Sequence, residues 1–263
     1  MYINLDKRVA IVNGGSKGIG KEIVRGLIDS GSYVVACSRR ESNLIKLKKE
    51  VLSKNLITIK ADATLYSSVK KVIRFTITKF GKIDILVNNT GGTNSVGTFA
   101  NLKINDWKKT FDTNVLSAIY FIKSAENELK KSKNARIINI SSISGIEPGF
   151  YNPHYSLSKA AIINLTKYLA NYYAKNKILV NVISAGPINS STWDINIGKM
   201  IKNKKNFGYH FKNIQNKEKN KIPLNKIGQS KDIASMVVYL SSDFASWITG
   251  SSFNIHGGKQ KSI

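Results

Sequence analysis

The sequence predicts an α/β protein, a single domain built on a doubly wound parallel β-sheet with helices on both faces. Short apolar, β-branched runs alternate with amphipathic stretches along the chain, which is the order of β-α-β crossover units. The length of 263 residues suits one such domain. The four prolines and the absence of a repeated or Pro/Ser-rich stretch in the sequence give no sign of a linker between domains.

Each expected element is justified by its residue pattern. Apolar runs rich in β-branched residues predict strands at residues 9–12, 33–36, 56–59, 83–87, 136–140, 178–183 and 252–255. Apolar residues at helical spacing predict helices at residues 20–30, 43–52, 67–80, 105–131, 155–175 and 230–241. Because ligands of such sheets bind at the carboxyl ends of the strands, polar residues at those ends are the candidates for a site.

The first expected strand leads into the glycine-rich stretch VNGGSKGIG, residues 12–20, and then into a helix. Such a turn presents the free N–H groups of a helix start, and glycines let a pyrophosphate approach the backbone. The same residues, taken alone, also fit a plain connecting turn.

Polar and glycine residues also follow the fourth and fifth strands, in LVNNTGG (86–92) and IINISSISG (137–145). The next helix opens with YSLSK, which places Tyr155 and Lys159 one turn apart on the same face. A neighbouring ammonium favours the ionised phenol and tunes Tyr155 to donate and accept a proton. On spacing alone, an ordinary surface pair is the alternative.

The amino-acid composition restricts which kinds of binding partner are expected. The chain carries 41 Lys and Arg against 16 Asp and Glu, a formal charge of +25, which first suggests nucleic acid. The basic residues are scattered and accompany no recognition motif, so a compositional bias is favoured and nucleic-acid binding is not expected. No signal sequence or long uncharged apolar run is present, and the only cysteine is Cys37. We expect a soluble, cytoplasmic protein that does not bind membranes.

The Lys/Asn-rich segment at residues 187–223 interrupts the alternation of strands and helices. An insertion of this length predicts a substrate lid. A pair of solvated surface helices is the alternative for the same residues.

The chain resembles the short-chain dehydrogenase/reductase family over essentially its whole length, and is most similar to the 3-oxoacyl-[acyl-carrier-protein] reductase-like branch. The resemblance implies a Rossmann-type fold. Further similarity lies in KIGQSKDIA (226–234) and ITGSSFNIHGG (248–258). The family motifs occur here in order, as Gly14-x3-Gly18-x-Gly20, Asn88-Asn89-x-Gly91, Asn114, Ser142 and Tyr155-x3-Lys159.

The resemblance implies four catalytic residues. Tyr155 would protonate the carbonyl oxygen during reduction, and Ser142 would hydrogen-bond that oxygen. Lys159 would hold the nicotinamide ribose and support Tyr155, while Asn114 would organise a water path that resupplies the proton. No metal site is implied.

The implied cofactor is NADP(H). NAD-dependent relatives commonly carry an acid after the second strand, where this chain has Ser38, Arg39 and Arg40, with Lys17 adding a further cation. The implied cofactor contacts are Gly14, Ser16, Lys17, Gly18, Ile19, Gly20, Ser38, Arg39, Arg40, Asp62, Ala63, Asn88, Thr90, Gly91, Tyr155, Lys159, Pro187 and Ile188.

Three positions depart from the family pattern. Asn13 stands where threonine is usual, Thr90 where alanine is usual, and Ala185-Gly186-Pro187 where Pro-Gly is usual. The Asn13 amide can still form hydrogen bonds, so these departures bear on cofactor affinity more than on reaction type.

The expected function is therefore NADPH-dependent reduction of a ketone, either a small molecule or an acyl-carrier-bound 3-oxoacyl group. Alternatives are a sugar, steroid or polyketide carbonyl substrate, or a non-catalytic dinucleotide-binding protein. Basic residues at 199–221 would steer an acidic carrier electrostatically. Surplus apolar residues on the helices at 105–131 and 155–175 predict a symmetric homo-oligomer, for which we expect a tetramer, with a dimer as the alternative: Trp107, Phe111, Val115, Ile119, Ile122, Leu165, Tyr168, Leu169 and Tyr172.

Overall fold

The computed structural model describes residues 2–93, 95–189, 198 and 207–261. Its centre is a seven-stranded parallel sheet in the order β3-β2-β1-β4-β5-β6-β9. The strands are β1 (Val9–Asn13), β2 (Tyr33–Ser38), β3 (Leu56–Lys60), β4 (Ile85–Asn88), β5 (Arg136–Ser142), β6 (Leu179–Ala185) and β9 (Ser252–Ile255). The predicted doubly wound α/β fold is confirmed, and the strand order reverses between β1 and β4, where such folds bind ligands.

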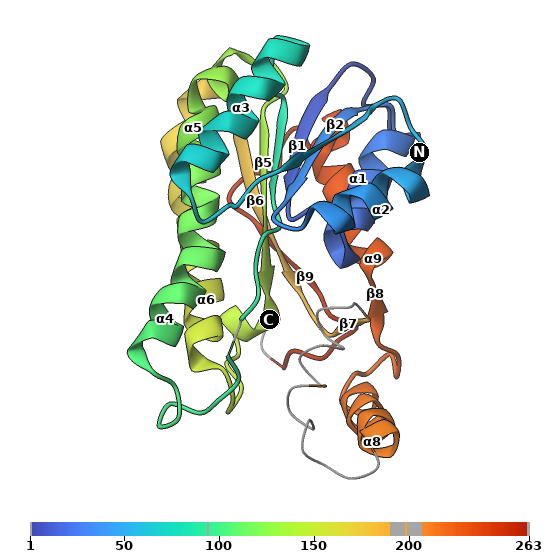
Figure 1. Ribbon diagram of the computed structural model, residues 1–263, viewed down its shortest axis with the longest axis vertical. Helices are drawn as coiled ribbons and strands as arrows, with labels where there is room; N and C mark the ends of the chain where they lie inside the picture. Colours follow the sequence, from blue (N-terminus) through green and yellow to red (C-terminus); the bar gives the residue numbers. More distant parts are fainter. Residues whose placement is uncertain (1, 94, 190–197, 199–206, 262–263) are drawn as a thin grey trace.

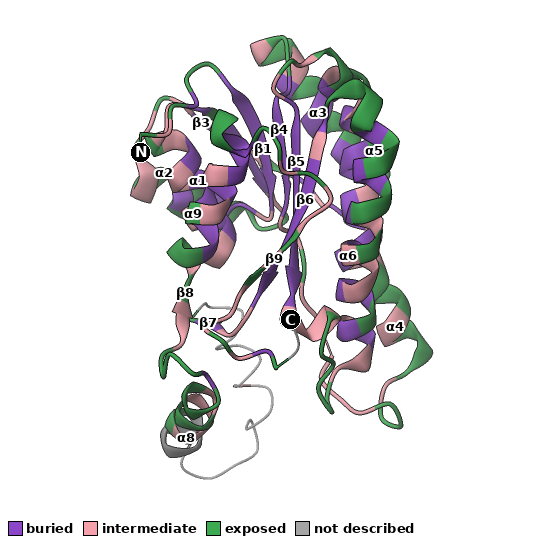
Figure 2. Cartoon of the chain, turned by 180° about the vertical axis from the view of Figure 1, so that it is seen from behind, coloured by how far each residue is buried: buried purple, intermediate pink, exposed green. Residues whose placement is uncertain are grey.

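Helices cover both faces of the sheet (Figure 1). One layer contains α1 (Gly18–Asp29), α2 (Glu41–Val51) and α9 (Ser230–Ser241), and the other contains α3 (Tyr66–Phe80), α5 (Ser117–Lys131) and α6 (Pro153–Tyr173). Successive side chains of a strand serve opposite layers: Ala10 and Val12 belong to the core under α1 and α9, whereas Ile11 belongs to the core under α3 and α5. The strands consequently lie buried between the two layers (Figure 2).

The expected helix at residues 105–131 is present, with a π-helical turn inside it. The structure has α4 (Ile104–Phe111), a π-helical turn (Asp112–Leu116) and then α5. A π-turn leaves the apolar spacing nearly intact, so periodicity did not reveal it. The turn directs Asn114 toward the end of β4, as described below.

The chain from residue 187 onward contains a helix, as the alternative for the segment at 187–223 expected, and two short strands that the sequence analysis missed. The two-residue strands β7 (Ile188–Asn189) and β8 (Gly228–Gln229) pair with each other, and α8 (Phe207–Asn220) lies between them in the chain. Residues 190–197 and 199–206 of the expected lid are outside the described part of the chain, including Lys199, Lys202, Lys204 and Lys205.

Part of the surplus apolar surface expected at a subunit contact is used inside the chain. Three of the residues expected at that contact are buried in the chain's own core: Val115, Ile122 and Leu169. The expectation that these three residues face another subunit is wrong. Tyr168 and Tyr172 remain exposed on α6.

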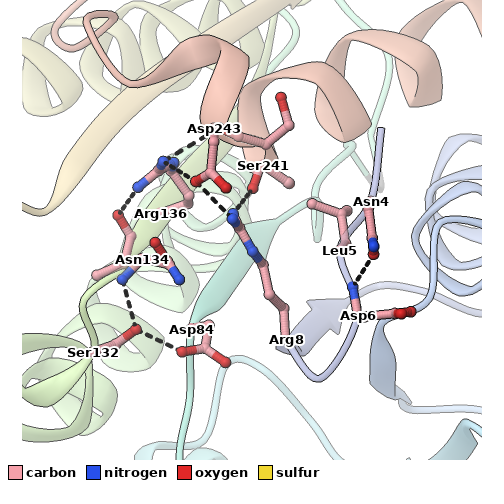
Figure 3. Close-up of polar contacts among 12 residues, drawn as sticks. Asn4, Leu5, Asp6, Arg8, Asp84, Ser132, Asn134, Arg136, Ser241 and Asp243 are labelled. Carbon is pink, nitrogen blue, oxygen red and sulfur yellow. Dashed lines mark hydrogen bonds and ion pairs between the residues drawn. The ribbon is translucent and has the colours of Figure 1, made fainter. Parts of the chain in front are cut away.

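A polar cluster holds the end of α9 to the amino ends of the strands, on the side of the sheet away from the glycine turn (Figure 3). Arg8 precedes β1 and Arg136 begins β5, and both are buried. Arg8 Nη2 lies 2.7 Å from Asp243 Oδ1, and Arg136 Nη2 donates to the carbonyl oxygen of Ser242 at 3.2 Å. These contacts bind the carboxyl end of α9, well away from the strand ends that carry the candidate site.

Within the described residues, no helix is both long and apolar enough to cross a membrane.

Candidate active site

The glycine turn after β1 requires its glycines. Gly14 and Gly18 have φ values of +66° and +52°, the left-handed region that favours glycine. A Cβ on Gly20 would lie 2.2 Å from the carbonyl oxygen of Gly14, so α1 can pack this closely only with glycine there. Lys17 is the N-cap residue of α1, and its side chain forms no hydrogen bond with the first turn of the helix. The N–H groups of that first turn are thus available to an anion at the strand ends.

Asn13 organises the end of β4. Its Oδ1 accepts hydrogen bonds from the backbone N–H groups of Asn89, at 3.0 Å, and Thr90, at 2.7 Å. Its Nδ2 donates to Asn88 Oδ1 at 2.7 Å. The expectation that the amide still forms hydrogen bonds in place of threonine is confirmed.

The chain of amides continues across the sheet. Asn88 Nδ2 donates to Asn139 Oδ1 at 2.8 Å, and Asn139 Nδ2 donates to Thr166 Oγ1 at 2.9 Å. These side chains are buried, so each bond satisfies a group that has no access to water. Sequence reasoning missed Asn139 and Thr166. The signal available was an asparagine within the apolar strand RIINIS.

Asn114 holds the glycine turn that follows β4. Its Nδ2 donates to the carbonyl oxygens of Gly92, at 2.7 Å, and Thr110, at 2.8 Å, while its Oδ1 accepts from the N–H of Gly92 at 2.9 Å. Asn114 is buried within the π-turn. A Cβ on Gly91 would lie 2.8 Å from both Asn114 Oδ1 and Lys159 Nζ. The turn therefore brings Asn114 and Lys159 to the same backbone segment.

Lys159 and Tyr155 come together at the start of α6. Lys159 Nζ donates to the carbonyl oxygen of Ile140 at 2.9 Å and lies 5.7 Å from the centre of the Tyr155 ring. Burial lowers the pKa of Lys159 to about 8. The ammonium therefore remains protonated at neutral pH and becomes neutral above about pH 8.

Ser142, at the end of β5, approaches the phenol from the sheet. Burial raises the pKa of Tyr155, and a hydrogen bond with the Ser142 side chain partly opposes the rise. Ser142 Oγ also accepts from the N–H of Ser144 at 3.2 Å. The net direction in this structure is thus a raised pKa of Tyr155, set by desolvation of the phenol.

Three cations gather at the ends of β1 and β2: Lys17 lies in the turn after β1, and Arg39 and Arg40 follow β2. Burial lowers the pKa of Lys17, with further contributions from Arg40 and Arg39, which shows that their positive charges act on one another. Ser38 Oγ donates to the carbonyl oxygen of Arg40 at 3.2 Å. In the part of the chain that the structure describes, none of the three cations forms an ion pair. The cluster therefore favours an anion.

The remaining predicted contacts also follow the carboxyl ends of strands. Asp62 follows β3, and its Oδ1 accepts from the N–H and hydroxyl groups of Thr64 at 2.9 and 2.7 Å.

Pro187 and Ile188 follow β6 and line a cavity of about 220 Å³. A larger cavity, of about 380 Å³, lies between α4 and α6 and is lined by His154 but not by Tyr155. We identify the site from the converging polar groups, because neither cavity contains the phenol. Of the other predicted cofactor contacts, Ser16 and Ala63 lie on the turns after β1 and β3, and Ile19 lies in the first turn of α1.

Similar proteins extend over nearly the whole chain. A family model described as enoyl-(acyl carrier protein) reductase matches residues 14–260. The chain is 30% identical over 257 residues to the acetoacetyl-CoA reductase of Acinetobacter sp. (strain RA3849), a match that covers 96% of this chain and 98% of that protein. It is 30% identical over 259 residues to the 3-oxoacyl-[acyl-carrier-protein] reductase of Synechocystis sp. (strain ATCC 27184 / PCC 6803 / Kazusa), covering 97% of each.

A solved structure shares the fold. The L-sorbose reductase of Gluconobacter frateurii, complexed with NADPH and L-sorbose, superposes with a TM-score of 0.92 at 26% identity and full coverage of both chains, 100% each. The family description names an enoyl substrate, whereas these proteins are named for acetoacetyl, 3-oxoacyl and sorbose substrates. The similarities agree on family and not on one substrate.

Proposed function

The chain belongs to the short-chain dehydrogenase/reductase family, and on that premise we propose that it is an NADP(H)-dependent enzyme that reduces a ketone to a secondary alcohol. The observation that carries the proposal is the meeting of Ser142, Tyr155 and Lys159 at the carboxyl ends of the strands, beside the glycine segment held by Asn114. A protein that only bound a dinucleotide would need no phenol there. Non-catalytic binding is therefore the weaker alternative.

The protein's own groups divide the proton chemistry. Tyr155 donates a proton to the carbonyl oxygen, and Ser142 donates a hydrogen bond that stabilises the charge developing there. Lys159 supplies a positive charge near the phenol, which favours the phenolate left after proton transfer. Asn114 fixes the backbone at Gly92 and lies near Lys159, where it can order the water that returns the proton. When bound, the nicotinamide supplies the hydride.

The residues after β1 and β2 fit a phosphorylated dinucleotide. The free N–H groups of the first turn of α1 suit a pyrophosphate, and Gly14 and Gly20 permit the tight packing of the turn that presents them. Arg39, Arg40 and Lys17 suit the additional 2′-phosphate of NADP(H). The related L-sorbose reductase is described with NADPH, which supports this choice.

For the substrate we propose a 3-oxoacyl thioester, free or carried on an acyl carrier protein. The names of the two sequence relatives support this class. A sugar ketone is the second candidate, supported by the fold shared with L-sorbose reductase. The proposal includes a tetrameric, cytoplasmic enzyme with a substrate lid at residues 187–223.

Turnover of NADPH against a substrate panel tests this function. The panel contains acetoacetyl-CoA, a carrier-bound 3-oxoacyl group, the corresponding enoyl thioester, L-sorbose and a cyclic ketone. We expect the highest kcat/KM with a 3-oxoacyl thioester, and loss of that activity in Tyr155→Phe. Tight NADPH binding without turnover of any panel member would instead favour a binding protein, and turnover of the enoyl thioester alone would contradict ketone reduction.

A further inference from the structure

His154 has no part in the reaction described above, although it directly precedes Tyr155. It lies in the first turn of α6 and is 2% exposed. Its Nε2 is 2.8 Å from Thr93 Oγ1 and 3.2 Å from Ser95 Oγ, both in the loop between β4 and α4. A buried imidazole thus joins the helix that carries Tyr155 to this loop.

The hydrogen bonds of the loop determine where the imidazole proton lies. Thr93 Oγ1 donates to the carbonyl oxygen of Ser95 at 2.7 Å, so its only hydrogen is already used. Thr93 Oγ1 must therefore accept from His154 Nε2–H. The neutral ring then leaves a lone pair on Nδ1, which is buried and has no hydrogen-bond partner among the described residues.

The same loop is fixed at both ends. Asn152, which precedes α6, accepts at Oδ1 from the N–H of Gly97 at 3.1 Å and donates its own N–H to the carbonyl oxygen of Gly97 at 2.8 Å. At the other end, Asn114 holds Gly92. His154 supplies the contact between these two points.

We propose that His154 is a positioning residue that holds the loop around Thr93 and Ser95 beside Tyr155 as a preformed wall for the ketone substrate. The inference rests on the proposed function, and it assigns His154 to substrate binding and not to proton or hydride transfer. Holding the wall in place before binding reduces the ordering that the substrate must impose. His154 therefore acts on KM and leaves kcat nearly unchanged.

The surroundings of the ring make this contact depend on pH. Burial lowers the pKa of His154, and the nearby Asp106 carboxylate on α4 only partly opposes the effect. Lys108 and Asp112 line the cavity beside the ring, and the Trp107 ring centre lies 5.9 Å away. Protonation at Nδ1 would place a charge where no described group accepts its hydrogen bond. Because the folded pKa lies below the ordinary value of about 6.5, the neutral ring is stable above that pH, and the arrangement loses stability as the pH falls below it.

Two substitutions at His154 distinguish a role in positioning the loop from a general contribution to the fold. His154→Ala removes the donor and should raise KM for the ketone about three- to tenfold, the usual value of one neutral hydrogen bond, with little change in kcat. His154→Gln keeps an N–H donor for the loop and does not titrate. It should restore KM at neutral pH and abolish the rise in KM on acidification. A KM in His154→Gln as high as in His154→Ala overturns the proposal.

A double-mutant cycle identifies the partner. Thr93→Ala should raise KM as His154→Ala does, and the double variant should be no worse than either one, because both remove the same contact. Thr98→Ala is the matched control, since Thr98 Oγ1 donates to Asn101 Oδ1 at 2.6 Å on the exposed side of the same loop. It should leave KM unchanged. Additive effects of Thr93→Ala and His154→Ala contradict the shared contact.

Hydrogen exchange in the free protein distinguishes failure of this inference from failure of the proposed function. Exchange of the amides of Ser95 and Gly97 should accelerate in His154→Ala and not in His154→Gln. If the unmodified protein reduces no ketone, the proposed function fails, and the exchange result still decides whether His154 holds the loop. Unchanged exchange in His154→Ala overturns the inference whatever the activity.

Discussion

Lys159 Nζ donates a hydrogen bond to the carbonyl oxygen of Ile140 at 2.9 Å, and this contact holds an ammonium whose pKa burial has lowered to about 8. Above that pH the amine becomes neutral and no longer favours the phenolate of Tyr155. We therefore expect kcat/KM and the affinity for NADPH to decrease above about pH 8, as measured by initial rates and fluorescence titration.

Lys159→Arg is the control for this pH dependence, because a guanidinium stays charged across the whole range. The decrease should move to higher pH in the variant, whatever its absolute activity. The stability of the fold should change with pH in the opposite direction to kcat/KM. The unfolded chain holds this proton up to about pH 10.4, so the free energy of unfolding should rise between about pH 8 and 10. An identical alkaline limb in Lys159→Arg would assign the titration to another group.

Removing the Tyr155 hydroxyl should separate catalysis from binding. Tyr155→Phe keeps the ring beside Lys159 and removes the proton donor, so turnover should fall about 100- to 10,000-fold. The affinity for NADPH, measured by fluorescence titration, should stay nearly unchanged, because the phosphate contacts lie after β1 and β2. Wild-type turnover in this variant on an authentic substrate would refute the proposed mechanism.

Residue patterns predicted the alternation of strands and helices and placed Tyr155 and Lys159 on one helical face, because both depend on local spacing. The amide chain from Asn13 to Asn139 depends on pairing between strands far apart in sequence: its bonds join residues 75 and 51 positions apart. The π-turn at Asn114 leaves no clear mark on periodicity. The pKa of Tyr155 follows from burial, which spacing does not report.

Arg39→Asp should shift the cofactor preference toward NAD(H). The variant replaces a cation suited to the 2′-phosphate with a carboxylate suited to the ribose 2′-hydroxyl. The ratio of kcat/KM for NADPH to that for NADH should fall about 10- to 100-fold, the value of one or two charge-assisted hydrogen bonds. Arg74→Asp, an exposed change on α3, is the matched control for net charge. Equal efficiency of the unmodified enzyme with both cofactors would contradict the assignment.

The exposed aromatic side chains of α6 should contact another subunit. Tyr168 and Tyr172 are 62% and 56% exposed, and their rings stack with centres 6.1 Å apart. We expect a tetramer by sedimentation at micromolar concentration, and a smaller species for Tyr168→Glu/Tyr172→Glu, since burying unpaired carboxylates is unfavourable. Phe75→Glu, on the exposed side of α3, should leave the mass unchanged. A monomeric mass for the unmodified protein would count against this surface.

The polar cluster under α9 should stabilise the fold through Arg8 more than through Asp243. The Arg8 side chain is 7% exposed and also donates to the carbonyl oxygen of Ser241, whereas the Asp243 side chain is 74% exposed (Figure 3). Arg8→Ala leaves that buried carbonyl without its partner and should lower the free energy of unfolding by about 1–3 kcal/mol in urea titrations. Asp243→Asn keeps an acceptor in a solvated position and should cost less than about 1 kcal/mol. A loss in Asp243→Asn equal to that in Arg8→Ala would show that the ion pair, and not the buried carbonyl contact, holds α9 to the sheet.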